Sequence, residues 1–201
     1  MPRPRSINDD IVLDRVLEVF WRSGYAGTSM RDLSQATGLG AAALYHRFGD
    51  KDGIFVEAVR RYADEGLIER LSRLSAVDDP VEAIATFFDE LIAMSVADPD
   101  RRGCLLVNTA LDGAAMSDAA RALVQERLGQ VETFFRDQLQ RAQHVGCVGP
   151  DMQPDMMAEA LFGTVLAIRV LARLAPDHGR LRRLADNALK PLASAKTAAR
   201  Q

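Results

Sequence analysis

The sequence is poor in the residues that build metal, redox and disulfide sites. Its two cysteines are Cys104 and Cys147, and its three histidines are His46, His144 and His178. These residues are isolated along the chain, whereas zinc sites bring such ligands together at short spacings. No glycine-rich phosphate-binding loop follows a strand-like segment either. The sequence therefore predicts no metal site, no cofactor and no catalytic residue, and we do not expect an enzyme.

Long apolar runs are also missing, although 48% of the residues are hydrophobic. Every uncharged run is far shorter than the ~18 residues that a membrane span needs. The N-terminal segment, MPRPRSINDD, is polar and has no signal-peptide pattern. With so few cysteines, these features predict a cytoplasmic protein with reduced thiols and no membrane partner.

Charge is small overall but unevenly distributed. The formal net charge is −3, so composition alone does not indicate a nucleic-acid-binding protein. Residues 1–52 contain seven Arg or Lys against seven Asp or Glu, and residues 62–164 contain eight against eighteen. A neutral N-terminal part beside an acidic body suits DNA binding if only local cations meet phosphate. The excess of Arg and Lys in residues 165–201 is most simply a solvated helix face.

What the sequence does contain is helical periodicity. Leu13, Val16, Leu17 and Phe20 form the apolar stripe of a first helix, which Gly24 ends. Caps, prolines and glycines delimit further helices at about 51–76, 80–98, 103–111, 117–144, 154–176 and 177–195, with N-caps expected at Asp50, Asp79 and Ser117. No strand pattern is found. The prediction is an all-α fold of about nine helices.

The segment from Thr28 to Asp52 reads as two very short helices joined by a tight turn. Thr28 or Ser29 caps the first of them, and Gly38 supplies the left-handed conformation of the turn. The second covers the run Ala41-Ala42-Ala43-Leu44-Tyr45, with Leu44 and Phe48 as core anchors. A short helix with a small-residue outer side fits the roughly 12 Å major groove of DNA. The pattern predicts a helix-turn-helix.

This region resembles the DNA-binding head of the tetracycline-repressor (TetR/AcrR) family over residues of about 10 to 56. The residues that carry the resemblance are Gly24, Tyr25, Thr28, Ser29, Leu33, Ala36, Thr37, Gly38, Leu39, Leu44, Tyr45, Phe48, Lys51, Asp52 and Phe55. The resemblance implies a DNA-binding domain at 1–52 and a ligand-binding and dimerisation domain at 53–201. It also implies a repressor that leaves a palindromic operator when a small-molecule or thiol-reactive inducer acts on the body. The alternative is an activator or a DNA-binding protein without ligand control.

The resemblance also implies where DNA is contacted. The residue that matches Tyr45 binds phosphate in the family, and Lys51 offers its ammonium and nearby backbone N–H groups. The alternative for Tyr45 is a core position. The other candidates are Thr28, Arg31, Ala41, Ala42, His46 and Arg47, together with Arg3 and Arg5 before the first helix. For His46 the alternative is a helix cap, for Arg31 and Arg47 a solvated face, and for the two N-terminal arginines a mobile tail.

The sequence departs from the family pattern where the recognition helix begins. Family members commonly have polar side chains at the positions of Gly40, Ala41 and Ala43. Alanine cannot donate to or accept from a base edge. What remains is contact with thymine methyl groups, close backbone approach and readout of DNA shape.

The helix expected at 154–176 is apolar on almost every side. Between Ala160 and Ala172 only Thr164 and Arg169 are polar. A helix that is apolar all round is buried all round, either inside a monomeric bundle or against a second copy. The resemblance favours a homodimer through residues of about 154–195, and we expect Val165 and Ile168 in its seam. Arg169 then needs a carboxylate, a carbonyl or an anionic ligand.

The run Gly103-Cys104-Leu105 resembles a TetR subgroup that includes electrophile-sensing repressors. A thiol at a helix N-terminus beside Arg101 and Arg102 is expected to have a lowered pKa, which favours sensing. The alternative is a buried cysteine that acts as a small hydrophobe. The candidate ligand-binding or sensing residues are Cys104, Asn108, Phe88, Met94, Phe134 and Arg169. Most of the apolar candidates are also expected to be core.

Overall fold

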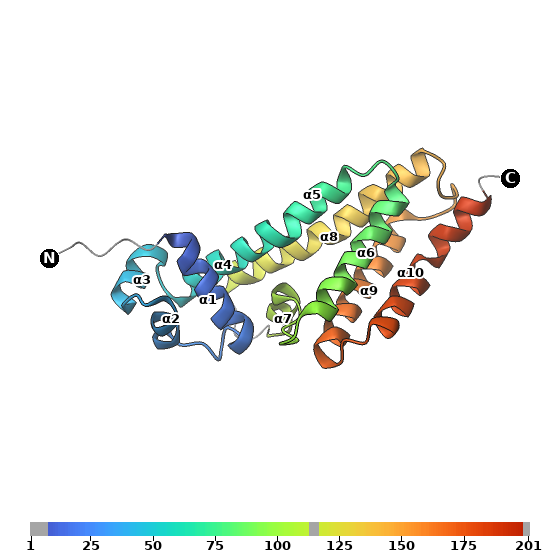
Figure 1. Ribbon diagram of the computed structural model, residues 1–201. Helices are drawn as coiled ribbons and strands as arrows, with labels where there is room; N and C mark the ends of the chain where they lie inside the picture. The colour runs from blue at the N-terminus through green and yellow to red at the C-terminus, as the bar shows by residue number, and fades with distance from the viewer. Residues whose placement is uncertain (1–7, 113–116, 199–201) are drawn as a thin grey trace. The chain divides into compact units, whose positions relative to one another are not determined.

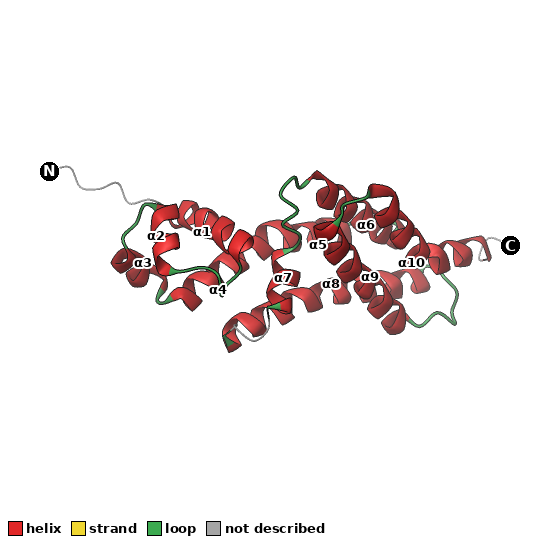
Figure 2. Cartoon of the chain, turned by 90° about the horizontal axis from the view of Figure 1, so that it is seen from below, coloured by secondary structure: helices red, strands yellow, loops and turns green. Residues whose placement is uncertain are grey.

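The computed structural model describes residues 8–112 and 117–198, and every regular element in them is helical (Figures 1 and 2). The elements are α1 (Asp9–Ser23), α2 (Met30–Thr37), α3 (Ala41–Phe48), α4 (Lys51–Tyr62), the π-helix η1 (Ala63–Ile68), α5 (Glu69–Ser75), α6 (Pro80–Ala97), α7 (Leu105–Leu111), α8 (Asp118–His144), α9 (Pro154–Leu174) and α10 (His178–Ala198). The predicted all-α fold is confirmed. Across these same residues, no helix combines the length and the apolar character that a membrane span requires.

Three helices begin at the side chains that the sequence predicts as their caps. The Asp50 carboxylate accepts the N–H of Gly53 at 2.9 Å, and Asp79 accepts the N–H of Val81 at 2.9 Å. The Ser117 hydroxyl accepts the N–H of Ala120 at 3.2 Å at the start of α8. All three predicted caps are therefore confirmed. Each satisfies a backbone donor that the helix cannot, which stabilises it by about 1 kcal/mol.

The expected single helix at about 51–76 is not α-helical throughout. The π-helix η1 separates α4 from α5, and it contains Gly66, a poor helix former. A π turn holds more residues than an α turn, so it shifts which side chains share a face on either side of it. Periodicity read from sequence assumes a constant turn and does not reveal such an insertion.

The chain forms two compact units, and their limits differ from the expected division at residue 52. The first unit comprises the chain up to Leu67 together with Asn108–Glu126, and the second comprises Ile68–Val107 and the chain from Arg127 onward. The reason for the difference is α4. It packs against α1 and α3, and its buried Ile54 and Phe55 belong to the hydrophobic core of the first unit.

Four phenylalanines form the centre of the second unit. Phe87 and Phe88 come from α6, and Phe134 and Phe135 come from α8. The ring centroids of Phe87 and Phe135 are 5.0 Å apart, and those of Phe88 and Phe135 are 5.7 Å apart. All four side chains are buried. Phe88 and Phe134, which we expected at a ligand, are therefore packed as core residues, and a ligand role for them stays a prediction.

Helix α9 buries one face and leaves the other uncovered within the protomer. In the second unit it packs against α6 and α10, which also contact each other, and it lies behind both in Figure 1, with Val165 and Ile168 buried. These two residues are core positions of the protomer, so their expected place in a dimer seam is wrong. The uncovered face carries Val170, which is 40% exposed, and the half-buried Phe162 and Leu166. The sequence of α9 has apolar residues on two faces. Packing within the protomer determines which of these faces is buried.

Replacing Phe88 with alanine tests whether this aromatic cluster is a filled core. We expect Phe88→Ala to lower the free energy of unfolding by about 3–5 kcal/mol, because a large buried ring leaves a cavity. The control on the same helix is Val96→Ala, at an exposed position, with an effect within about 0.5 kcal/mol. Urea unfolding followed by circular dichroism measures both. An unchanged midpoint for Phe88→Ala would contradict the assignment.

Candidate nucleic-acid interface

The first unit holds its two shortest helices on a shared apolar core. Leu33 of α2 and Leu44 of α3 are fully buried, as are Val16 and Phe20 of α1. The rings of Phe20 and of Phe55 from α4 meet edge to face with their centroids 4.9 Å apart. These contacts anchor α2 and α3 by one face each, so their other faces are available to a partner.

The turn between α2 and α3 is built as the sequence predicts. Gly38 has φ 75° and ψ 8°, and its N–H donates to the Ser34 carbonyl at 2.9 Å. A residue with a Cβ is strained in this left-handed conformation. From α1, the Arg15 guanidinium donates to the Thr37 carbonyl at 2.9 Å, which ties the end of α2 to the scaffold. The predicted helix-turn-helix is confirmed.

Helix α3 has an inner and an outer face. Leu44 is buried and Phe48 is half-buried, as their predicted role as anchors requires. The exposed residues are Ala41, Ala42, Tyr45 and His46, with Tyr45 50% exposed. The alternative that Tyr45 is a core residue is excluded by this exposure. We call these four residues the outer face of α3.

Gly53 is a structural requirement of the interface that the sequence analysis missed. A Cβ added to Gly53 would overlap the carbonyl oxygen of Phe48, where the end of α3 meets the first turn of α4. Only glycine allows this close approach. Glycine lowers the stability of a helix by about 1 kcal/mol relative to alanine. Its presence in the first turn of a predicted helix was therefore the signal in the sequence that this position needs glycine.

Thr28, one of the predicted contact residues, is engaged within the unit. Thr28 is 2% exposed, and its hydroxyl donates to the Gly24 carbonyl at 2.7 Å. The cap of α2 is instead Ser29, whose hydroxyl accepts the N–H of Asp32 at 3.2 Å, while Asp32 accepts the N–H of Ser29 at 2.8 Å. This reciprocal pair is a capping box. The Thr28 side chain therefore has a structural role, and a phosphate contact by Thr28 stays a prediction.

The arginines differ in their surroundings. Arg31 lies exposed on α2. Arg47 is half-buried, and its guanidinium forms an ion pair with Asp9 of α1 at 3.2 Å. Surface pairs of this kind are worth about 0–1 kcal/mol, so DNA phosphate can compete for Arg47. Arg3 and Arg5 lie outside the described residues.

Lys51 makes contacts that its sequence context did not predict. Its Nζ donates to the carbonyl oxygens of Tyr25 at 3.1 Å and Thr28 at 3.0 Å. Nζ also lies 4.1 Å from the centroid of the Tyr25 ring. Burial, with a hydrogen bond and the negative charge of Asp52, raises the pKa of Tyr25 to about 12. Tyr25 is therefore a neutral phenol at any working pH.

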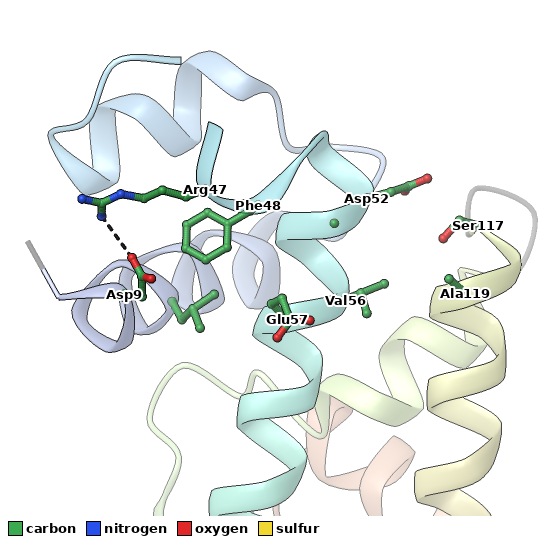
Figure 3. A pocket seen from close by; sticks show the side chains of 10 residues that line it. Asp9, Arg47, Phe48, Asp52, Val56, Glu57, Ser117 and Ala119 are labelled. Carbon is green, nitrogen blue, oxygen red and sulfur yellow. Dashed lines mark hydrogen bonds and ion pairs between the residues drawn. The ribbon is translucent and has the colours of Figure 1, made fainter. Parts of the chain in front are cut away.

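A pocket of about 600 Å³ lies within the first unit (Figure 3), and its lining residues do not include the four of the outer face of α3. Its walls come from α1, α3, α4 and the start of α8, and they carry Asp9, Arg47, Phe48, Asp52 and Glu57 among others. Figure 3 shows the Arg47–Asp9 ion pair at its edge. In the described part of the chain, no group of three or more His, Cys, Asp or Glu residues is arranged to hold a metal ion.

The thiol proposed as a sensor is largely enclosed. Cys104 precedes α7 and is only 9% exposed. The neighbouring Arg102 is engaged by Asp98, which accepts its backbone N–H at 2.7 Å and its guanidinium Nε at 3.3 Å. Burial raises the pKa of the Asp98 carboxyl, but these bonds and the Arg102 charge outweigh it and hold that pKa below its usual value. One of the two arginines expected to activate the thiol is thus already paired.

The remaining body residues are dispersed. Met94 is exposed, whereas Phe88 and Phe134 are in the aromatic core. Asn108 is half-buried in α7. Arg169 donates to the Ser95 hydroxyl at 3.2 Å, so its partner is neither the carboxylate nor the carbonyl that we expected. The described structure does not assemble these residues into one site, and a ligand role for each stays a prediction.

Comparison with known families matches both parts of this chain. Residues 12–58 match the family described as bacterial regulatory proteins, tetR family. Residues 80–188 match the tetracyclin repressor-like C-terminal domain. The chain belongs to the TetR family. It is accordingly a DNA-binding transcriptional regulator, a class distinct from enzymes.

Individual TetR-family relatives align over almost the whole chain. The HTH-type transcriptional regulator YezE of Bacillus subtilis (strain 168) is 29% identical over 194 residues, which cover 96% of this chain and 100% of the relative. The HTH-type transcriptional repressor ComR of Escherichia coli (strain K12) is 26% identical over 189 residues, 94% of this chain and 90% of the relative. A cysteine-substituted form of the TetR family regulator CifR, solved with 26-bp double-strand operator DNA, is 30% identical with a TM-score of 0.84, and the match covers 94% of this chain and 98% of that one.

Proposed function

We propose that this TetR-family protein is a repressor that binds a palindromic operator as a homodimer and leaves it when an inducer acts on the body. The observation that carries the DNA-binding part is the outer face of α3, presented by a capped helix-turn-helix. Two findings support the proposal. ComR is named a repressor, and CifR has been solved with operator DNA. Operators of bacterial regulators lie in the cytoplasm, where we place its action.

On this proposal α3 enters the major groove. Tyr45 and His46 at its exposed edge donate to phosphate oxygens, and Arg31 and Arg47 add charge from α2 and α3. Such contacts fix the orientation of the protein on the duplex but carry little sequence information. The base edges are left to Ala41 and Ala42.

The direct test is operator binding by wild type and by Tyr45→Phe. We expect wild type to select a palindromic sequence from random duplexes and to bind it more tightly than unrelated DNA. Tyr45→Phe keeps the ring and removes one hydroxyl donor, so affinity for operator and for unrelated DNA should fall together, by about 1 kcal/mol. Fluorescence anisotropy measures both.

The control for the hydroxyl is Tyr62→Phe, in the same unit but on α4. Its operator affinity is expected to match wild type. If Tyr45→Phe changed only the preference for operator over unrelated DNA, the phosphate role of Tyr45 would be wrong. If wild type selected no sequence, the proposed function itself would fail.

The two alanines of the outer face of α3 predict a feature of the operator sequence. Alanine offers a base pair only a methyl group, and the apolar group of the major groove is the thymine C5-methyl. We therefore propose that Ala41 and Ala42 lie against thymines in each half-site.

Replacing thymine by uracil, which lacks only that methyl group, tests this prediction. Each thymine is replaced singly. For at least one thymine per half-site, the replacement should weaken binding by about 0.8 kcal/mol, the contribution of one buried methyl-sized group. Uracil outside the half-sites is the control and should have no effect. Uniform indifference to uracil would leave shape readout as the source of specificity.

The dimer is proposed to form through the uncovered faces of α9 and α10, within residues of about 154–195. Leu166, Val170 and Leu174 follow one another at four-residue spacing on α9 and so share a face, and Leu174 is 71% exposed. Large exposed apolar side chains grouped on one helix are typical of protein interfaces. A dimer also supplies the two heads that a palindrome requires.

Val170→Glu is expected to separate the dimer without unfolding the protomer. It would place an unpaired charge in the proposed seam, at a cost of about 3–5 kcal/mol, yet Val170 is exposed within the protomer. Sedimentation should report monomers with unchanged helical circular dichroism and lost palindrome binding. Val145→Glu, at another exposed valine, is the control and should stay dimeric. A dimeric Val170→Glu would move the seam elsewhere.

The inducer is proposed to act non-covalently. Cys104 is enclosed and Arg102 is paired with Asp98, so the surroundings favour a packing role over a reactive thiolate. The interior of the body is aromatic and aliphatic, which favours a small apolar inducer over a thiol-reactive one. Release of operator by a mild alkylating agent in wild type, but not in Cys104→Ser, would reverse this preference.

A further inference from the structure

The Lys51 ammonium makes three contacts inside the first unit. An ammonium has three N–H donors and no acceptor. Two of them point to the carbonyl oxygens of Tyr25 and Thr28, at 3.1 and 3.0 Å. The aromatic face of Tyr25, with its centroid 4.1 Å away, receives the remaining positive charge. The ammonium is therefore engaged by three groups of its own unit.

These contacts join two segments far apart in the sequence. Tyr25 and Thr28 lie in the connection from α1 to α2, and Lys51 is the first residue of α4. The Tyr25 ring is itself held by the core, 5.1 Å from the Phe55 centroid and 6.4 Å from that of Phe20. Lys51 therefore ties the α1–α2 connection to the first turn of α4, beside the packed Tyr25 ring.

The tie bears directly on the recognition helix. The connection ends at Thr28, beside the Ser29 capping box that starts α2, and α2 leads through the Gly38 turn into α3. The C-terminal end of α3 meets α4 at Gly53, two residues beyond Lys51. The first turn of α4 therefore contacts both ends of the helix-turn-helix, through Lys51 at its start and through Gly53 at its end.

We propose that Lys51 is a positioning residue for DNA binding: its ammonium clamps the α1–α2 connection to α4 and thereby orients the helix-turn-helix, and it does not contact phosphate. This inference rests on the proposed operator binding and replaces the phosphate role that its place at the start of a helix predicted for the Lys51 ammonium. The proposal concerns the Lys51 ammonium and not the backbone N–H groups of this turn, of which that of Gly53 already donates to Asp50.

The clamp and the phosphate contact predict different responses to salt. A residue that neutralises one phosphate reduces the slope of log affinity against log salt by about one when its charge is removed. A clamp releases no counterion. We therefore expect Lys51→Met, which keeps a long apolar stem, to lower operator affinity about tenfold or more at every salt concentration, with an unchanged slope.

Lys51→Arg separates the two roles without loss of charge. A guanidinium binds phosphate at least as well as an ammonium does, but its planar fork does not fit the compact ammonium position between two carbonyls and a ring. On the clamp proposal Lys51→Arg also loses affinity. On the phosphate reading it retains affinity.

Amide hydrogen exchange on the free protein tests the clamp without DNA. Exchange in residues 24–29 should accelerate in Lys51→Met and remain as in wild type in Arg31→Met, which removes one exposed positive charge from the same unit. If Lys51→Met leaves exchange unchanged and reduces the salt slope by about one, the clamp is wrong. If Lys51→Met does not fold, Lys51→Arg decides. If wild type binds no operator, the exchange result still decides the clamp, while the proposed function fails by itself.

Discussion

The DNA-binding unit depends on one constraint: its two functional helices are too short to exist alone. Helices α2 and α3 have eight residues each, whereas isolated helices below about 12–15 residues are marginal in water. They persist because Leu33 and Leu44 are fully buried, with α2 packed on α1 and α3 packed on α4, and because a capping box closes the start of α2. Every exposed group of the outer face takes its position from this burial.

The same constraint explains why α4 carries so many contacts near its N-terminus. Within three residues it supplies Lys51 to the α1–α2 connection, Asp52 to Tyr25 and Gly53 to the end of α3. The basic Lys51, the acidic Asp52 and Gly53 each contact a different part of the unit. Substitutions in this turn are therefore expected to act through the geometry of the unit as well as through any contact of their own.

The second unit presents a contrasting problem, because apolar side chains at helical spacing serve as core, seam or ligand wall alike. The four phenylalanines of α6 and α8 contact one another, so the aromatic interior is occupied by its own rings. An inducer that enters there must displace some of these contacts. Such displacement is a physical route by which a small molecule changes helix packing, and packed cores shift between discrete arrangements more readily than they deform continuously.

The sequence by itself determined the helical class, most helix ends and the turn at Gly38. These depend on caps, glycine conformation and periodicity, which act over a few neighbouring residues. The tertiary structure decided that Val165 is internal while Val170 is exposed, and that the Lys51 ammonium lies on backbone carbonyls. It also decided where the chain divides into compact units. Such choices depend on contacts between residues distant in the chain, and local pattern contains no information about which of two apolar faces, or which of several acceptors, the fold brings near.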